Sequence, residues 1–208
     1  MKIRYAFDPV RTTRPSTRRA RRRALSLAVS AVLLGAVAVD VPAQTFPPVV
    51  QLSGLDGTNG FKLDGEVTGD YSGFSVATAG DVNGDGLDDL IVGAFLADPN
   101  GSISGRSYVV FGRSTGFPAT LQLSALNGTN GFKLDGEAAY DRSGVSVAAA
   151  GDLNGDGLDD LIVGADHADP NGSYSGRSYV VFGRTGVFAS PLQLSSLDGT
   201  NGFKLDGE

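Results

Sequence analysis

The chain of 208 residues has no cysteine, no tryptophan, one methionine and one histidine. The absence of cysteine excludes disulfides, thiolate-ligated zinc or iron–sulfur sites and thiol nucleophiles. Any catalytic histidine would have to be His167, which aligns with Leu96 in the internal repeat described below. The sequence shows no nucleophile elbow, no paired acid and base and no histidine-bearing metal motif, so we predict that these residues do not form an enzyme.

Positive charge is scarce outside the N-terminus. Residues 1–23 carry 9 of the 17 Lys and Arg, whereas residues 44–208 carry 8 basic and 21 acidic side chains. The formal net charge of −6 is therefore the sum of two unlike parts. The acidity of the second part argues against nucleic acid or an anionic membrane as partner and is compatible with cation binding.

Long apolar runs are also missing, apart from one of 16 residues at 24–39. It follows the basic head and ends near Val41-Pro42-Ala43, a pattern typical of a secretory signal peptide. We predict that residues 1–43 are this signal, cleaved after Ala43, and that the protein is secreted, periplasmic or held at the cell surface. The Sec and twin-arginine routes both remain open. Retention as a membrane anchor is the alternative, although 16 residues fall short of the roughly 18 that a spanning helix needs.

What the sequence does have is an internal repeat. Gln51–Glu66 recurs at 122–137 and at 193–208, each time after 71 residues, and residues 52–122 match residues 123–193 at 53 of 71 positions. We predict a signal at 1–43, an N-terminal arm at 44–51, one repeat at 52–122, a second at 123–193 and the start of a third at 194–208.

Within a repeat the apolar pattern is that of strands. Residues 74–80, 89–95 and 106–112 are short runs rich in β-branched and aromatic residues, and residues 60–66 form a weaker run. Turn-forming stretches separate them, and the predicted mature chain has no long helical stripe. Four short strands per repeat are typical of one blade of a β-propeller, so we predict an all-β fold.

The most specific motif is GDVNGDGLDD at 80–89, repeated as GDLNGDGLDD at 151–160. It places oxygen-bearing side chains at loop positions 1, 3, 5 and 9 and a backbone carbonyl at position 7, a donor set that suits Ca²⁺. The predicted ligands are Asp81, Asn83, Asp85, Leu87 and Asp89 in the first loop, and Asp152, Asn154, Asp156, Leu158 and Asp160 in the second. We predict about one Ca²⁺ per complete repeat. The alternative is a hairpin turn made by Asx and Gly without metal.

An EF-hand shares the first half of this motif. Its twelfth position needs a bidentate Glu, but Val92 and Val163 stand there, and a strand pattern follows in place of a helix. The loop is therefore predicted to join two strands.

Residues 72–112, SGFSVATAGDVNGDGLDDLIVGAFLADPNGSISGRSYVVFG, resemble an FG-GAP repeat, the blade unit of the integrin α-subunit β-propeller and of many bacterial exported proteins. The resemblance covers nearly all of residues 52–193. It implies that the loop joins the first two strands of a blade and binds Ca²⁺ through the residues named above.

The resemblance also implies that the GFKLDGE run which opens a repeat is the outer strand of the preceding blade. Residues 131–137 would then complete the first blade, residues 202–208 the second, and residues 60–66 would be left over. Closed propellers have about four to eight blades, so two repeats predict an incomplete propeller that self-associates.

Three functions remain open from the sequence. The leading one is a calcium-binding extracellular module that binds a protein or glycan ligand or mediates cell adhesion. The others are the non-catalytic propeller of a longer exported hydrolase and a purely structural spacer. We further expect Arg106 and Arg177 to pair with carboxylates, Asp88 and Asp159 to be solvated or to lie behind the metal ligands, and Tyr108 and Phe111 to pack between blades.

Overall fold

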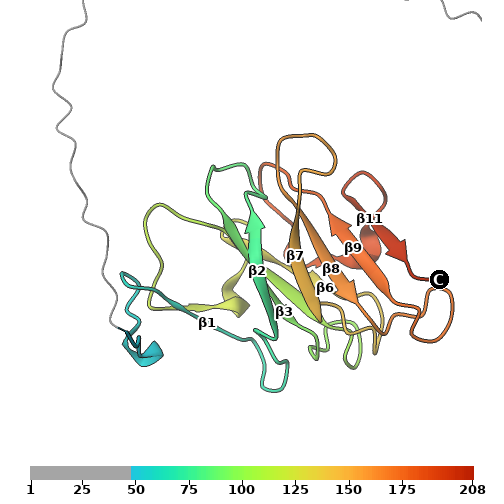
Figure 1. Cartoon of the computed structure of the whole chain (residues 1–208), viewed down its shortest axis with the longest axis horizontal. Coiled ribbons are helices and arrows are strands. Elements are labelled where there is room, and N and C mark those ends of the chain that lie inside the picture. The colour runs from blue at the N-terminus through green and yellow to red at the C-terminus, as the bar shows by residue number, and fades with distance from the viewer. Residues whose placement is uncertain (1–47) are drawn as a thin grey trace, which may run out of the picture. The chain divides into compact units, whose positions relative to one another are not determined.

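The computed structural model describes residues 48–208 (Figure 1). The strands are β1 (Lys62–Asp64), β2 (Ser75–Gly80), β3 (Asp89–Ala94), β4 (Arg106–Val110), β5 (Thr120–Gln122), β6 (Gly131–Asp135), β7 (Ser146–Gly151), β8 (Asp160–Ala165), β9 (Arg177–Val181), β10 (Leu192–Gln193) and β11 (Gly202–Asp206). Short 3₁₀ turns occupy Leu52–Gly54, Leu123–Ala125 and Leu194–Ser196, and these residues contain no α-helix. The predicted all-β fold is confirmed.

The strands form two antiparallel blades that lie side by side. Blade 1 has the order β2-β3-β4-β6, and blade 2 has the order β7-β8-β9-β11. The outer strand of each blade comes from the following repeat, because β6 pairs with β4 and β11 with β9. This is the exchange expected for the GFKLDGE runs, so the structural blade is displaced along the chain from the sequence repeat.

The leftover strand β1 pairs with neither blade. It lies parallel to β5, with Leu63 opposite Leu121, just as β10 lies parallel to β6 at the edge of blade 1. The strand pattern did not predict β5 or β10, because each is only two or three residues long. The residues described here contain two blades and no closed ring.

The main core lies between the blades, where β2 runs beside β7 (Figure 1). We call the side of a blade that faces the preceding repeat its front and the opposite side its rear. The rear of blade 1 contributes Ala79, Val82, Ile91, Val109, Phe132 and Leu134, and the front of blade 2 contributes Leu161, Val163, Tyr179 and Val181. Burying one such aliphatic side chain stabilises the fold by about 1.5–3 kcal/mol. Because this cluster is the larger of the two among residues 48–208, the interface makes the largest apolar contribution to their stability.

A bulge at the end of the first strand of each blade starts the loop that follows. The pairing of β2 with β3 shifts between Thr78 and Gly80, and the pairing of β7 with β8 shifts at the matching place. Gly80 has φ +70°, a conformation that glycine adopts without strain. The bulge bends the strand and turns the chain into the Asp-rich loop.

No helix among residues 48–208 is long and apolar enough to cross a membrane. The predicted signal peptide at 1–43 lies outside the residues that the structure describes.

Candidate metal loops

The two Asp-rich loops are closed by hydrogen bonds from their own backbone. Asp81 Oδ1 accepts from the N–H groups of Gly84 (2.8 Å) and Asp85 (3.1 Å), and Asp81 Oδ2 accepts from Gly86 (2.8 Å). Gly84 and Gly86 have φ of +78° and +84°, which lets the chain curl round the carboxylate. In the second loop, Asp152 makes the same three contacts.

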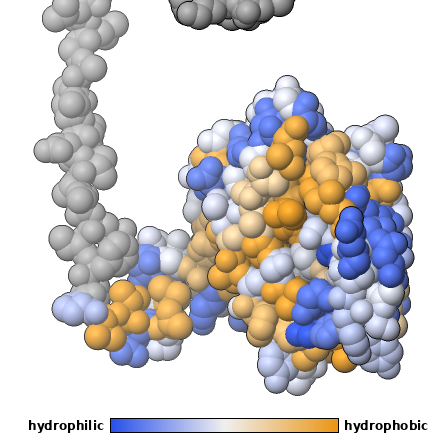
Figure 2. All heavy atoms as spheres, turned by 45° about the vertical axis from the view of Figure 1, so that its right-hand side comes forward, coloured by the Kyte–Doolittle hydropathy of each residue, from blue (hydrophilic) through white to orange (hydrophobic). Residues whose placement is uncertain are grey.

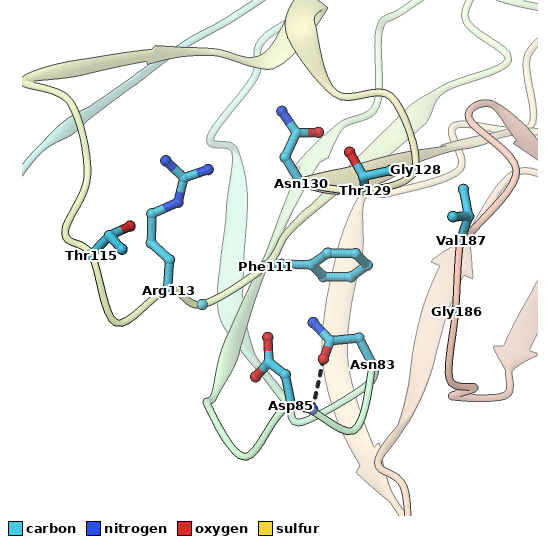
Figure 3. Close-up of a pocket in the computed structure, with 11 residues that line it drawn as sticks. Asn83, Asp85, Phe111, Arg113, Thr115, Gly128, Thr129, Asn130, Gly186 and Val187 are labelled. Carbon is cyan, nitrogen blue, oxygen red and sulfur yellow. Dashed lines mark hydrogen bonds between the residues drawn. The ribbon is translucent and has the colours of Figure 1, made fainter.

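The side chains at loop positions 3 and 5 each accept a hydrogen bond from the backbone N–H two residues further along the chain. Asn83 Oδ1 accepts from the N–H of Asp85 at 2.8 Å, the contact drawn as a dashed line in Figure 3, and Asp85 Oδ1 accepts from the N–H of Leu87 at 2.9 Å. Asn154 and Asp156 repeat both contacts. The side chains at positions 1, 3 and 5 therefore line the inside of one tight turn.

The position-9 carboxylates are buried at the start of the second strand of each blade. Asp89 Oδ2 accepts from the N–H of Val82 (3.1 Å), and Asp89 Oδ1 accepts from the N–H of Gly112 (2.8 Å). Burial, supported by the nearby charges of Asp85 and Asp81, outweighs these hydrogen bonds and raises the pKa of Asp89 to about 6. This carboxylate is therefore costly to ionise unless a positive charge lies beside it.

No such positive charge comes from the protein. Within residues 48–208, no Lys, Arg or His forms an ion pair with the Asp residues at positions 1, 5 and 9 of either loop. In that part of the chain, no three acidic or histidine side chains converge as a ready-made metal site. The donors are oxygen only, and most of the carboxylate oxygens keep a lone pair after accepting one N–H. This donor set fits a hard divalent cation, and the ten predicted ligands stay a prediction.

Asp159, at loop position 8, was expected to be solvated or to lie behind the metal ligands. Its Oδ2 accepts a hydrogen bond at 2.9 Å from the N–H of Asp81, which is a predicted ligand of the loop in the neighbouring blade. Leu158 also reaches that loop, since its side chain lies against Gly84. No pattern within one repeat predicts these contacts, because they depend on how one blade packs on the next.

A second polar cluster, which the sequence analysis missed, joins the leftover segment to blade 1. Glu66 accepts hydrogen bonds from Arg106 (2.7 Å), Lys133 (2.9 Å) and Tyr108 (3.2 Å). Arg106 Nε also donates to Asp135 at 2.6 Å, so the expected carboxylate partner of Arg106 is confirmed.

The same cluster recurs in blade 2 around Glu137. This carboxylate accepts from Arg177 (2.9 Å), Lys204 (2.9 Å) and Tyr179 (3.2 Å). The sequence signal that could have revealed it is the presence of Glu, Arg, Tyr and Lys at equivalent places in each repeat, but they are 40 to 67 residues apart along the chain.

A polar cavity of about 590 Å³ opens beside the first metal loop (Figure 3). Asn83 and Asp85 lie on one side, Arg113, Thr129 and Asn130 lie on the other, and the Phe111 ring lies between them. Phe111 packs against Phe132 and Phe188, which confirms its expected place between the blades. Arg113 stacks on Phe117, with its guanidinium carbon 5.2 Å from the ring centre. The cavity thus offers both signs of charge, amide groups and an aromatic surface.

The family model for the FG-GAP repeat matches the chain twice, at residues 72–110 and 143–181. These residues are FG-GAP repeats. Each match runs from just before the first strand of a blade to the end of its third strand, so the FG-GAP unit holds three of the four strands and the whole Asp-rich loop.

Integrin α subunits are similar to the region that contains these FG-GAP repeats. Integrin alpha-PS2 of Drosophila melanogaster is 36% identical over 142 residues, which are 65% of this chain and 10% of that protein. Integrin alpha-5 of Xenopus laevis is 33% identical over 181 residues, 78% of this chain and 16% of that protein. Integrin alpha-IIb of Mus musculus is 37% identical over 139 residues, 64% of this chain and 12% of that protein. The chain thus spans at most about a sixth of the length of these relatives.

Proposed function

We propose that this chain is a calcium-stabilised, exported ligand-binding module of the integrin α kind. Each FG-GAP repeat would hold one Ca²⁺ in its Asp-rich loop, through the side chains at positions 1, 3, 5 and 9 and the carbonyl at position 7. The observation that carries the proposal is the pair of matching loops, each with three carboxylates at the proposed ligand positions and, within the described residues, no ion pair to neutralise them.

Calcium fits these loops better than softer metals do. The donors are carboxylate, amide and carbonyl oxygens, and neither loop contains imidazole or thiolate. A bound cation would offset the cost of ionising the buried Asp89 and the repulsion among the three carboxylates. The cation would act structurally. It would fix the conformation of the loop and, through the hydrogen bond from Asp81 to Asp159, it would also stabilise the contact between the blades.

Thermal unfolding in calcium and in chelator tests the metal proposal. Extracellular calcium modules bind at about 10⁻⁴ to 10⁻³ M, so about 1 mM Ca²⁺ should stabilise each loop by about 0.4–1.4 kcal/mol. Asp85→Ala and Asp156→Ala should each remove about half of the calcium-dependent shift, whereas Asp88→Ala, one position before the ligand Asp89, should leave it unchanged. A wild-type melting temperature that is the same in calcium and in chelator would overturn the proposal.

The ligand of this module would be an extracellular protein or glycan. The similarity to integrin α subunits and the polar cavity beside the first loop support this part of the proposal. An array of extracellular matrix proteins and glycans would test it, with Arg113→Ala in the cavity and Lys62→Ala on the exposed strand β1 as a matched pair. Binding that is lost in Arg113→Ala and kept in Lys62→Ala supports the cavity as the site. If the wild type binds nothing on the array, or both variants bind as it does, that site is wrong.

A further inference from the structure

Two segments of this chain are nearly the same sequence in unlike surroundings. Residues 51–66 and residues 193–208 are identical at 15 of 16 positions. The second is built into blade 2, where β11 pairs with β9 over five residues. The first forms no blade strand: it pairs with β5 over three residues, stacks Phe61 on Phe117 with the ring centres 4.0 Å apart, and places Glu66 in its polar cluster. Leu52 is 70% exposed, whereas its equivalent Leu194 is fully buried.

Strand β1 pairs with β5 in the same way as β6, the outer strand of blade 1, pairs with β10. The position of β1 is therefore the one that the outer strand of a preceding blade would take. The Glu137 that follows β6 reaches the Arg, Tyr and Lys of blade 2, and the Glu66 that follows β1 reaches those of blade 1. Glu208 follows β11 in the same way and is exposed. Its matching partners would be the Arg106, Tyr108 and Lys133 of another blade 1.

The two outer faces of the described body carry both halves of the interface that already joins blade 1 to blade 2. On the front of blade 1, Val76 is 67% exposed and Leu90 37%, although the equivalent of Leu90 in blade 2, Leu161, is 1% exposed. On the rear of blade 2, Leu153 is 55% exposed and Leu205 50%, although the equivalent of Leu205 in blade 1, Leu134, is fully buried. Figure 2, turned toward the β9–β11 side, shows apolar side chains gathered in a band between hydrophilic loops.

The polar groups of the internal interface also have equivalents on the two outer faces. Ser75 Oγ donates to the carbonyl of Gly144 (2.8 Å), and the N–H of Asp81 donates to Asp159 (2.9 Å). The matching groups at the two outer faces are Ser146 with the carbonyl of Gly73, and the N–H of Asp152 with Asp88.

We propose that two copies of this chain associate head to tail by strand exchange, with blade 2 of one copy docking on the front of blade 1 of the next and its segment 193–208 displacing segment 51–66. The lost contacts of β1 and Glu66 are replaced by the same contacts from β11 and Glu208. The exchange itself is therefore close to neutral, and burial of the two apolar faces drives association.

The same substitution, Glu to Ala, at two equivalent repeat positions tests the exchange. Glu208→Ala removes the incoming contact and should raise the dissociation constant of the full 208-residue chain about tenfold, since the lost contact joins a carboxylate to two cations. Glu66→Ala removes the competing contact and should lower that constant by a similar factor. Sedimentation equilibrium at fixed calcium measures both. A wild type that stays monomeric, or two variants that shift in the same direction or not at all, would overturn the proposal.

Engineered cysteines give a second readout, and the chain has none of its own. Asp64 lies opposite Gln122 in the pairing of β1 with β5, and Asp135 lies opposite Gln193 in the pairing of β6 with β10. In the exchanged assembly, Asp206 of one copy lies opposite Gln122 of the next. A mixture of Asp206→Cys and Gln122→Cys chains should form a mixed disulfide dimer on oxidation. The double variant Asp64→Cys/Gln122→Cys should close on itself and stay monomeric. Absence of the mixed dimer while the internal disulfide forms would contradict the exchange.

Discussion

Asp159 accepts a hydrogen bond from the N–H of Asp81 at 2.9 Å, and the N–H of Asp159 donates to the carbonyl of Asp81 at 3.2 Å. This two-way link joins the second Asp-rich loop to the first. The N–H of Arg184 adds a bond to the carbonyl of Val82 at 2.9 Å. The loop proposed to bind calcium is thus also part of the contact between the blades.

Asp159→Ala should destabilise the chain by about 1–2 kcal/mol, because it removes a hydrogen bond to a charged acceptor at the blade interface. The matched control is Asp88→Ala, the same change at the same repeat position, which should cost less than about 0.5 kcal/mol. Chemical denaturation at a dilution where the chain is monomeric compares them. Equal losses would show that the link between the loops contributes nothing.

Gly93→Ala should be far more damaging than Gly164→Ala, although the two glycines are equivalent in the repeat. A Cβ on Gly93 would lie 2.0 Å from the carbonyl oxygen of Gly144 in the next blade, whereas a Cβ on Gly164 meets only the side chain of Ser146 at under 3 Å. Backbone cannot move aside as a hydroxyl can. We expect a cost of about 2 kcal/mol or more for Gly93→Ala and about 1 kcal/mol or less for Gly164→Ala, measured by urea unfolding. A larger loss in Gly164→Ala would contradict the blade packing.

Glu137→Gln should lower stability in a pH-dependent way. Burial raises the pKa of Glu137, but the hydrogen bond from Lys204 and the charges of Lys204 and Arg177 together hold it below its ordinary value. A lowered folded-state pKa means that the ionised carboxylate stabilises the fold above about pH 4.5 and that this contribution is lost as the pH falls through the lowered value.

The difference in unfolding free energy between wild type and Glu137→Gln should therefore be about 1–2 kcal/mol at pH 7. It should shrink as the pH falls below about 4.5 and should vanish once the pH lies below the lowered folded-state pKa. Denaturation curves at a series of pH values provide the measurement. A difference that stays constant across this range would mean that the charge of Glu137 does not stabilise blade 2.

The strands were predictable, because β-branched runs, Gly-rich turns and a 71-residue repeat all point to blades, whereas their exchange between repeats was implied by the resemblance to the FG-GAP repeat. The apolar run after each Asp-rich loop predicted that the loop joins two strands, and the resemblance implied that these are the first two strands of a blade, as the structure has them. The short strands β5 and β10 were missed, since a pair or triplet of residues has no measurable periodicity.

The contacts of Glu66, Glu137 and Asp159 could not be predicted from the pattern of one repeat. Each links groups 40 or more residues apart, and the partner is chosen by the register of strands and by the packing of one blade on the next. Identical residues also behave differently in the two repeats. Asp88 and Asp159 have the same sequence neighbours, yet only Asp159 has a neighbouring loop to bind in the part of the chain described.

Isothermal titration of calcium into the full chain tests the central claim most directly. The account predicts two sites per chain with dissociation constants of about 10⁻⁴ to 10⁻³ M, one site in Asp85→Ala, one in Asp156→Ala and none in the double variant. No heat of binding to the wild type at millimolar calcium would contradict it, and so would an unchanged number of sites in the double variant.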